Sequence, residues 1–282
     1  MSPARVSARE LAERYRLTLM EVPRRGHAGE VIGRGTGASL EFQDRRNYSA
    51  GDDVRHIDWR ALGRTDQVMV RVYREELRPR LELLVDTSRS MNTDPDKAGR
   101  TLELAQFFAR AGAAGGTEVR CIALGDRPRL IDLDQLDAGE LAFDARAPLA
   151  VALAAATPLF GAGCLRLVIS DFLAPHDARE LVRPLGARAG VLVLIQVLSE
   201  FDANPHAGEA LRLTDAETEG TLDAWIDART LERYRSRLSA LVANLEVEAR
   251  RGGGRFFSIV ASEALEISCS RRFVPAGLIE PA

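Results

Sequence analysis

The sequence has few cysteines, no long hydrophobic run and no excess of charge of either sign. Its three cysteines, Cys121, Cys164 and Cys269, stand far apart, without the paired spacing of a zinc site or a disulfide framework, so we expect a reducing compartment. The longest apolar candidate, Val191–Leu198, is far short of the roughly 20 residues that a membrane span needs. Charges interrupt every stretch near the N-terminus that could form a signal-peptide core. These absences indicate a cytoplasmic protein without its own anchor.

Charge and composition also narrow the class of partner. The chain has 38 basic and 41 acidic residues, a formal net charge of −3, with both signs mixed throughout. Nucleic-acid binding needs a basic stripe to neutralise phosphates, and none is present. A hydrophobic content of 46% with 28% charged residues is typical of a globular protein. The 282 residues suffice for one sizeable core, or for one core and a smaller appendage.

The character of the sequence changes near residue 80. Residues 1–79 are rich in glycine and arginine and lack long apolar runs, which predicts a small β-rich extension of turns and short strands. The alternation from Val68 to Arg74 predicts a half-exposed strand that could join the main sheet. Residues 80–282 have the pattern of a second, larger domain.

In this larger domain, buried strands alternate with helices. An amphipathic helical stretch containing Leu102 and Phe108 follows the first strand. Strands are expected at Leu81–Val85, Glu118–Leu124, Leu165–Ile169, Val191–Leu198 and Arg255–Val260, and helices near Leu149–Ala156, Ala178–Ala187 and Asp227–Ala249. Repeated β-then-α order predicts a doubly wound α/β domain of the Rossmann type, with a mainly parallel sheet and helices on both faces.

Polar residues follow two of these strands. Asp86, Ser88 and Ser90 form an Asp-x-Ser-x-Ser pattern directly after the first strand, and Asp171 follows the strand at Leu165–Ile169. Ligands of such sheets gather at the carboxyl ends of the strands. One carboxylate and two hydroxyls can supply part of an oxygen cage for Mg²⁺, and the second carboxylate can accept a hydrogen bond from metal-bound water. The alternative is that these residues only cap and turn the chain.

Two stretches carry a family resemblance. Residues 48–60 read Tyr-Ser-Ala-Gly-Asp-Asp-Val-Arg-His-Ile-Asp-Trp-Arg, and residues 84–91 read Leu-Val-Asp-Thr-Ser-Arg-Ser-Met. Together they resemble the bacterial domain-of-unknown-function 58 family, whose members contain a von Willebrand factor A-like domain. The resemblance covers most of the chain from about Gly33 onward. It implies a metal-ion-dependent adhesion site at Asp86, Ser88, Ser90 and Asp171, and frequent pairing with MoxR-type AAA+ ATPases in a chaperone-like or assembly role.

The sequence departs from the implied site at one ligand. Sites of this type include a loop threonine before a helix, and aligning Ala152 and Leu153 with that pattern puts Ala147 at the threonine position. Asp144 is the candidate substitute, and Thr157 would have to reach the site from a different place. Because Mg²⁺ dehydrates reluctantly, we expect weak Mg²⁺ binding or a metal-free remnant of the site.

The segment Tyr48–Arg60 has chemistry of its own. Arginines and carboxylates beside a tryptophan can form bidentate ion pairs. The residues concerned are Asp52, Asp53, Arg55, Asp58, Trp59 and Arg60. They predict either an internal network that locks the extension onto the main domain or a docking surface, since Trp and Arg are common interface anchors.

The sequence therefore favours a binding protein over an enzyme. The leading hypothesis is a module that binds a protein client or a MoxR-type AAA+ ATPase through the strand-end site, without turnover. One alternative is a metal-independent structural scaffold that uses the Tyr48–Arg60 segment. Another is a metal-assisted hydrolase, which lacks an evident general base because Asp86 and Asp171 would both serve the metal.

Overall fold

The computed structural model describes residues 7–18, 40–49, 52, 54–65, 67–75, 80–206, 208–214, 216 and 220–282. The chain divides into two compact units, residues 1–24 together with 79–282, and residues 25–78. Residues 7–18 therefore lie in the larger unit, whereas the sequence placed them in the extension. Helix α1 (Ala8–Arg14) packs on α3 (Pro95–Ala114), and β1 (Tyr15–Leu17) pairs antiparallel with β12 (Ile279–Pro281).

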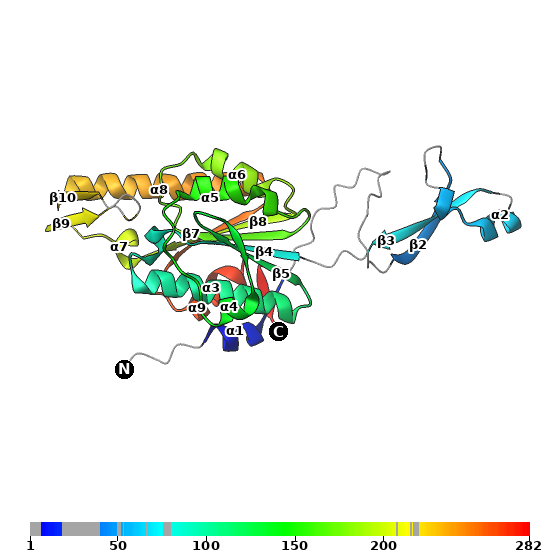
Figure 1. Cartoon of the computed structure of the whole chain (residues 1–282), viewed down its shortest axis with the longest axis horizontal. Coiled ribbons are helices and arrows are strands. Elements are labelled where there is room, and N and C mark those ends of the chain that lie inside the picture. The colour runs from blue at the N-terminus through cyan, green and yellow to red at the C-terminus, as the bar shows by residue number, and fades with distance from the viewer. Residues whose placement is uncertain are drawn as a thin grey trace. The chain divides into compact units, whose positions relative to one another are not determined.

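The larger unit is a mixed α/β structure built on a six-stranded sheet (Figure 1). The strand order is β11-β8-β7-β4-β5-β6, and every pairing is parallel except that of β6 with β5. The strands are β4 (Arg80–Asp86), β5 (Glu118–Leu124), β6 (Arg129–Ile131), β7 (Leu165–Ser170), β8 (Val191–Leu198) and β11 (Arg255–Val260). The prediction of a mainly parallel sheet is confirmed.

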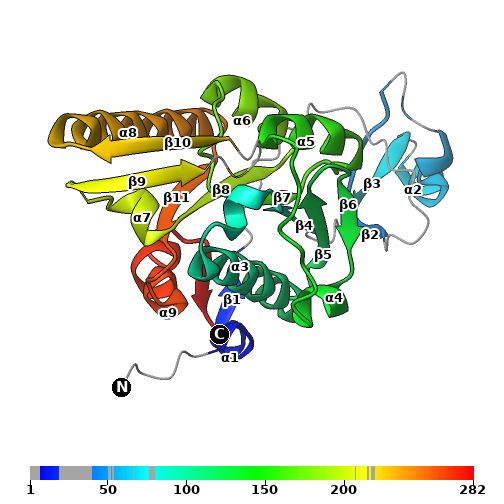
Figure 2. The same ribbon diagram turned by 60° about the vertical axis from the view of Figure 1, so that its left-hand side comes forward.

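Helices cover both faces of this sheet, as expected (Figures 1 and 2). One face carries α1, α3, α4 (Leu133–Asp137) and α9 (Leu265–Ser268); the other carries α5 (Leu149–Ala156), α6 (Ala178–Gly186) and α8 (Ala228–Arg251). The remaining helical turns of this unit are η2 (Arg89–Asn92), η3 (Thr157–Leu159), α7 (Glu200–Ala203) and η4 (Cys269–Phe273). A separate hairpin joins β9 (Glu209–Thr214) to β10 (Thr221–Ile226).

Alternation along the strands separates two hydrophobic cores. Leu81, Leu83 and Val85 of β4 pack with the α3 side, whereas Leu84 packs with the α5 and α6 side. This follows from the two-residue period of a strand. Because β5 and β7 lie on opposite sides of β4, the chain reverses its winding direction between β4 and β7. Crevices at such reversal points are the usual ligand sites of these sheets.

Two helix boundaries have clear local causes. Asp94 is the N-cap residue of α3: its carboxylate accepts a hydrogen bond from the amide of Asp96, and Pro95 occupies the first helical position. Asp227 is the N-cap residue of α8 and accepts a hydrogen bond from the amide of Thr230. The chain leaves α8 through Gly254, where a Cβ atom would lie 2.3 Å from the carbonyl oxygen of Leu192.

The smaller unit contains its own two-stranded sheet. Strand β2 (Leu40–Asn47) pairs antiparallel with β3 (Met69–Glu75), and between them lie η1 (Val54–His56) and α2 (Trp59–Thr65). The strand expected at Val68–Arg74 therefore pairs with β2. Strand β4, which follows it, has β5 and β7 as its neighbours in the central sheet.

A buried ion-pair cluster crosses the central sheet near the start of its strands. Glu82 on β4 lies opposite Arg166 on β7 and Arg120 on β5. The Nη2 atom of Arg166 lies 2.9 Å from Oε2 of Glu82. The Nη1 atom of Arg120 lies 3.2 Å from Oε1 of Glu82. Arg166 also donates to the carbonyl of Leu185 at the end of α6. Glu82 thus joins three strands, and Arg166 connects them to helix α6.

We predict that Glu82→Gln lowers the free energy of unfolding by about 3–5 kcal/mol, because it leaves the Arg166 charge buried without its partner. The matched control is Glu118→Gln, which removes an exposed ion pair with Arg80 and should cost less than about 1 kcal/mol. Denaturant unfolding of both variants measures the difference. Equal losses would contradict a special role for the buried pair.

Candidate functional site

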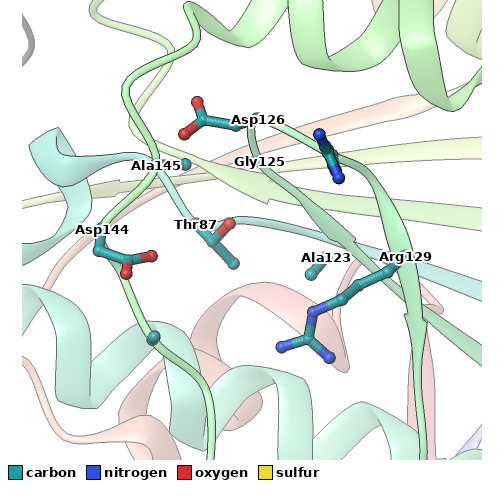
Figure 3. Close-up of a pocket in the computed structure, with 9 residues that line it drawn as sticks. Thr87, Ala123, Gly125, Asp126, Arg129, Asp144 and Ala145 are labelled. Carbon is teal, nitrogen blue, oxygen red and sulfur yellow. The ribbon is translucent and has the colours of Figure 1, made fainter.

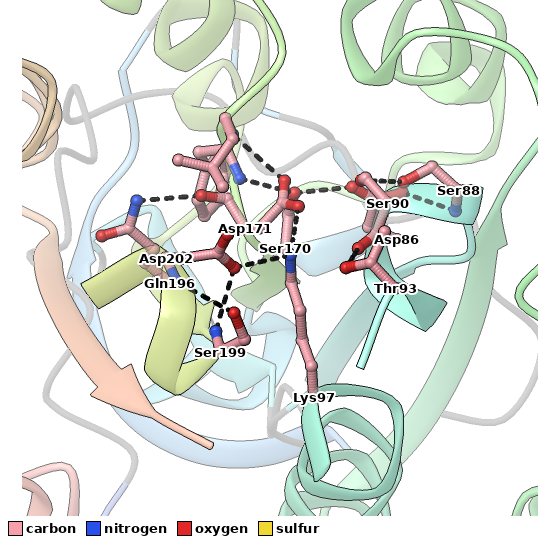
Figure 4. Close-up of polar contacts among 12 residues, drawn as sticks. Asp86, Ser88, Ser90, Thr93, Lys97, Ser170, Asp171, Gln196, Ser199 and Asp202 are labelled. Carbon is pink, nitrogen blue, oxygen red and sulfur yellow. Dashed lines mark hydrogen bonds and ion pairs between the residues drawn. The ribbon is translucent and has the colours of Figure 1, made fainter. Parts of the chain in front are cut away.

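Asp86, the last residue of β4, lies at the reversal point and is nearly completely buried, with 2% of its surface exposed. Its Oδ1 atom accepts a hydrogen bond from the amide of Ser88 at 2.9 Å. Its Oδ2 atom accepts from the hydroxyl of Ser170, the last residue of β7, at 2.6 Å. The carboxylate therefore connects the ends of two neighbouring strands and holds the loop that follows β4 (Figure 4).

The two serines of the motif lie together. The Ser88 and Ser90 hydroxyl oxygens are 3.0 Å apart and hydrogen bonded. The loop is fixed from outside as well: the amide of Arg89 donates to the carbonyl of Ala145, and the amide of Ala145 donates to the carbonyl of Thr87. Asp86, Ser88 and Ser90 thus lie close together at the end of β4.

Asp171 follows β7 and is held by three contacts. Its Oδ2 atom lies 2.7 Å from Nζ of Lys97, its Oδ1 atom accepts from the amide of Leu173, and its carbonyl accepts from the side chain of Gln196. The next residue, Phe172, is buried in a left-handed backbone conformation with φ of 53°. Its amide donates to the Ser170 hydroxyl. Strained backbone of this kind is typical of functional sites.

Two residues that the sequence reasoning missed complete the cluster (Figure 4). Lys97 reaches it from the first turn of α3, and its ammonium also lies 3.2 Å from Oδ2 of Asp202. Asp202 belongs to α7, directly after β8, and its carboxylate also accepts a hydrogen bond from the amide of Ser199, the N-cap residue of α7. Each of three adjacent strands, β4, β7 and β8, is therefore followed at or near its end by an aspartate. Tyr234 of α8 donates to the Asp202 carbonyl at 2.6 Å.

The electrostatics of the cluster follow from burial. Burial and the nearby Asp171 carboxylate raise the pKa of Asp86 from its ordinary 3.8 to about 6. The hydrogen bonds from Ser170 and Ser88 lower this pKa, but by less. Burial alone would lower the pKa of Lys97, but the Asp171 and Asp202 carboxylates outweigh it and the pKa is raised. Lys97 is therefore a charged ammonium at neutral pH.

A divalent ion fits only part of this arrangement. Asp86, Ser88 and Ser90 offer oxygens, but Asp171 already pairs with a fixed ammonium. At the position of the expected threonine, Ala147 has no side-chain oxygen, and its amide donates to Asp126 at 2.7 Å. Among the described residues, no group of three or more His, Cys, Asp or Glu side chains could hold a metal ion. This donor set does not match a site built for resident Mg²⁺, which requires near-octahedral oxygen coordination.

Beside the motif loop lies a small hollow of about 180 Å³ (Figure 3). It is lined on the strand side by Thr87 and Gly125, and charged side chains surround it: Asp126, Arg127, Arg129 and Asp144. Asp144, the candidate substitute for the missing ligand, is exposed at this rim. The hollow is smaller than the roughly 300–1,000 Å³ typical of small-molecule sites.

The predicted network at Tyr48–Arg60 lies in the smaller unit. Asp52 pairs with Arg46 and accepts from the amide of Ser49. Asp58 is buried and accepts from the amides of Arg60 and Ala61, capping α2. Trp59 is 65% exposed, and Arg55 and Arg60 are also exposed. Asp53 lies outside the described residues. The hydrogen bonds of Asp52 and Asp58 described here are local to this unit.

Comparison with known proteins identifies the family. A family model described as "Protein of unknown function DUF58" matches residues 44–246. The chain belongs to this family.

Two curated relatives are uncharacterized proteins, Rv1480 of Mycobacterium tuberculosis and Mb1516 of Mycobacterium bovis. Each is 27% identical over 253 residues, covering 82% of this chain and 78% of the relative.

Two solved structures are also similar to the chain. One is an aerotolerance-related membrane protein from Bacteroides fragilis, with a TM-score of 0.39, 13% identity, and coverage of 70% of this chain and 99% of that chain. The other is BatB, a conserved hypothetical protein from Bacteroides thetaiotaomicron, with a TM-score of 0.38, 13% identity, and coverage of 70% and 98%. Within the part of the chain that the structure describes, no helix is long and apolar enough to cross a membrane.

We predict that Asp86→Asn removes a pH dependence of stability. Because the folded pKa of Asp86 exceeds its ordinary value, the stability supplied by its proton is complete below about pH 3.8 and lost as the pH rises through about 6. Relative to the unmodified protein, the variant should therefore gain on the order of 3 kcal/mol between about pH 4 and 7. Denaturant unfolding across this range measures the gain.

The control for this prediction is Asp223→Asn. Asp223 is exposed, and its hydrogen bond from Arg212 holds its pKa below the usual range. The stability that this ion pair supplies is present at higher pH and lost as the pH falls. Asp223→Asn should therefore change the dependence of stability on pH weakly and in the opposite direction. Parallel profiles of Asp86→Asn and the unmodified protein would show that Asp86 is not perturbed.

Proposed function

We propose that this chain is a protein-binding module that acts with a MoxR-type AAA+ ATPase in the assembly or maturation of a client protein. It does so through the carboxyl edge of a von Willebrand factor A-like sheet. The observation that carries the proposal is the polar edge at the reversal point, where the Asp86 loop and the hollow of Asp126, Arg129 and Asp144 adjoin. The family resemblance supplies the class of partner.

The exposure of the edge decides how a partner would contact it. Asp86, Ser88 and Asp171 are each only 2% exposed, so these side chains organise the edge from beneath. The charged residues around the hollow are accessible, and both signs are present. Such a surface favours a partner with complementary charges of both signs, because charge complementarity controls specificity and association rate. A cavity of about 180 Å³ suits one inserted side chain.

Binding without turnover fits the bonding of the cluster better than catalysis does. A hydrolase needs a base that can accept a proton from the attacking water. Asp86 accepts from Ser170 and Ser88, and Asp171 is paired with Lys97. The serine hydroxyls of the motif bond one another. The hydrolase alternative would therefore have to draw its base from elsewhere in the chain.

A second contact surface is favoured by one observation in the smaller unit. Trp59 is 65% exposed and Val54 59% exposed, although large apolar side chains are normally covered. Tryptophan is among the strongest interface anchors. The scaffold alternative, in which residues 48–60 form the docking surface, rests on this exposure.

We predict that Asp144→Ala and Arg129→Ala each reduce recovery of the AAA+ ATPase by roughly tenfold in a pull-down, since rim charges set affinity and on-rate. Their melting points should stay unchanged, because both side chains are exposed. The matched control is Arg235→Ala, an exposed charge on α8, which should leave recovery unchanged. Full recovery with both rim variants, combined with loss in Trp59→Ala, would replace the strand-edge proposal with the scaffold.

A further inference from the structure

Lys97 is the one lysine in a chain that contains 38 basic residues; all the others are arginines. It is also among the least accessible, with a side chain 2% exposed. Its stem leaves the first turn of α3, and its head group reaches the carboxyl edge of the sheet. A buried lysine normally needs a strong electrostatic reason, because desolvation of the ammonium is costly.

The reason is the pair of carboxylates on neighbouring strands. The ammonium lies 2.7 Å from Asp171 and 3.2 Å from Asp202, after β7 and β8 respectively. It neutralises the negative charge that would otherwise accumulate where several aspartates gather in low-dielectric surroundings. A divalent ion performs the same electrostatic task in sites of the resembled type.

We propose that the Lys97 ammonium is the resident cation of this strand-end cluster and that it excludes divalent metal from the site. Three observations on the chain combine here. One carboxylate oxygen of Asp171 already pairs with the ammonium, and the other accepts a hydrogen bond from the amide of Leu173. A second, doubly charged cation would be repelled by the ammonium at short range. Ala147, at the threonine position, offers no compensating ligand.

The residue type supports this assignment. An ammonium is a compact point charge on a flexible stem, whereas a guanidinium is planar and broad. Bridging two carboxylates from a helix in a closed site requires the smaller group. All the remaining Lys and Arg positions of the chain are arginine. The single lysine therefore stands where a charge of the size of an ion fits.

The first test compares melting points in EDTA and in about 10 mM Mg²⁺, since a ligand that binds only the folded state raises the melting point. The unmodified chain should show no shift. Lys97→Met should melt roughly 10 °C lower in EDTA, because Asp171 and Asp202 lose their counter-charge. Mg²⁺ should then restore roughly 5 °C or more. If this variant folds only when Mg²⁺ is present, that dependence gives the same answer.

Three further variants identify the cause of any metal response. Lys97→Arg keeps the charge and should stay insensitive to Mg²⁺, even if the larger head group lowers the melting point. Ala147→Thr alone should also show no response to Mg²⁺. This result would show that Lys97, and not the missing threonine ligand, prevents metal binding. Lys97→Met combined with Asp171→Asn removes both charges, so it should recover stability in EDTA and lose the response to Mg²⁺.

A second readout uses the single lysine directly. Amine acylation followed by mass spectrometry reports on the accessibility of Lys97 in the folded protein. Labelling should be slow and unchanged by Mg²⁺. A saturable Mg²⁺ shift in the unmodified chain, faster labelling with Mg²⁺, or no metal response in Lys97→Met would overturn the proposal. None of these measurements involves a partner, so the inference stands or fails separately from the proposed binding function.

Discussion

The ion pairs of Lys97 with Asp171 and Asp202 determine how the carboxyl edge of the sheet is held. They join the first turn of α3 to the carboxyl ends of β7 and β8, beside the point between β4 and β7 where the strand order reverses. Asp86 extends the same cluster to β4 through the Ser170 hydroxyl. The loops that form the edge are therefore positioned from inside by charge and hydrogen bonds, in a place where apolar packing alone could not satisfy so many carboxylates.

A second buried cluster, Glu82 with Arg166 and Arg120, lies near the opposite end of the same central strands. Between the two clusters, the α3-facing residues of β4 and β7 are leucines, valine and isoleucine with no exposed surface or very little. The apolar core supplies most of the favourable free energy, whereas misplacing either charged cluster would leave buried charges without partners. We infer that the clusters fix strand register, because a shift of β7 by one residue would separate Arg166 from Glu82 and turn the Arg166 side chain to the opposite face of the sheet.

Much of the fold was predictable because buried parallel strands have continuous apolar sequences. Strands β5, β8 and β11 have the expected bounds, β7 is one residue longer at its end, and β4 is one residue longer at each end. The motif at Asp86, Ser88 and Ser90 was recognisable because its residues are close in sequence. The short antiparallel pairings of β6 and of β1 with β12 depend on tertiary contacts and leave little sequence signal.

The cation of the cluster was harder to find. Lys97 meets Asp171 and Asp202 across 74 and 105 residues, and no local spacing connects them. The signal that could have indicated it is composition: one lysine in an otherwise arginine-only set of basic residues, near the start of a helix that follows the motif. Asp202 could have been suspected because it stands four residues after a fully buried strand.

Gly254 sets how closely the exit of α8 approaches the sheet. Its Cα carbon faces the carbonyl oxygen of Leu192 so closely that even a methyl group would overlap it. The spacing between this helix and β8 is therefore determined by the absence of a side chain. Any substitution there would push α8 away from the sheet, displacing the edge strand β11 and uncovering Leu245 and Ala249, two of the residues by which α8 contacts the core.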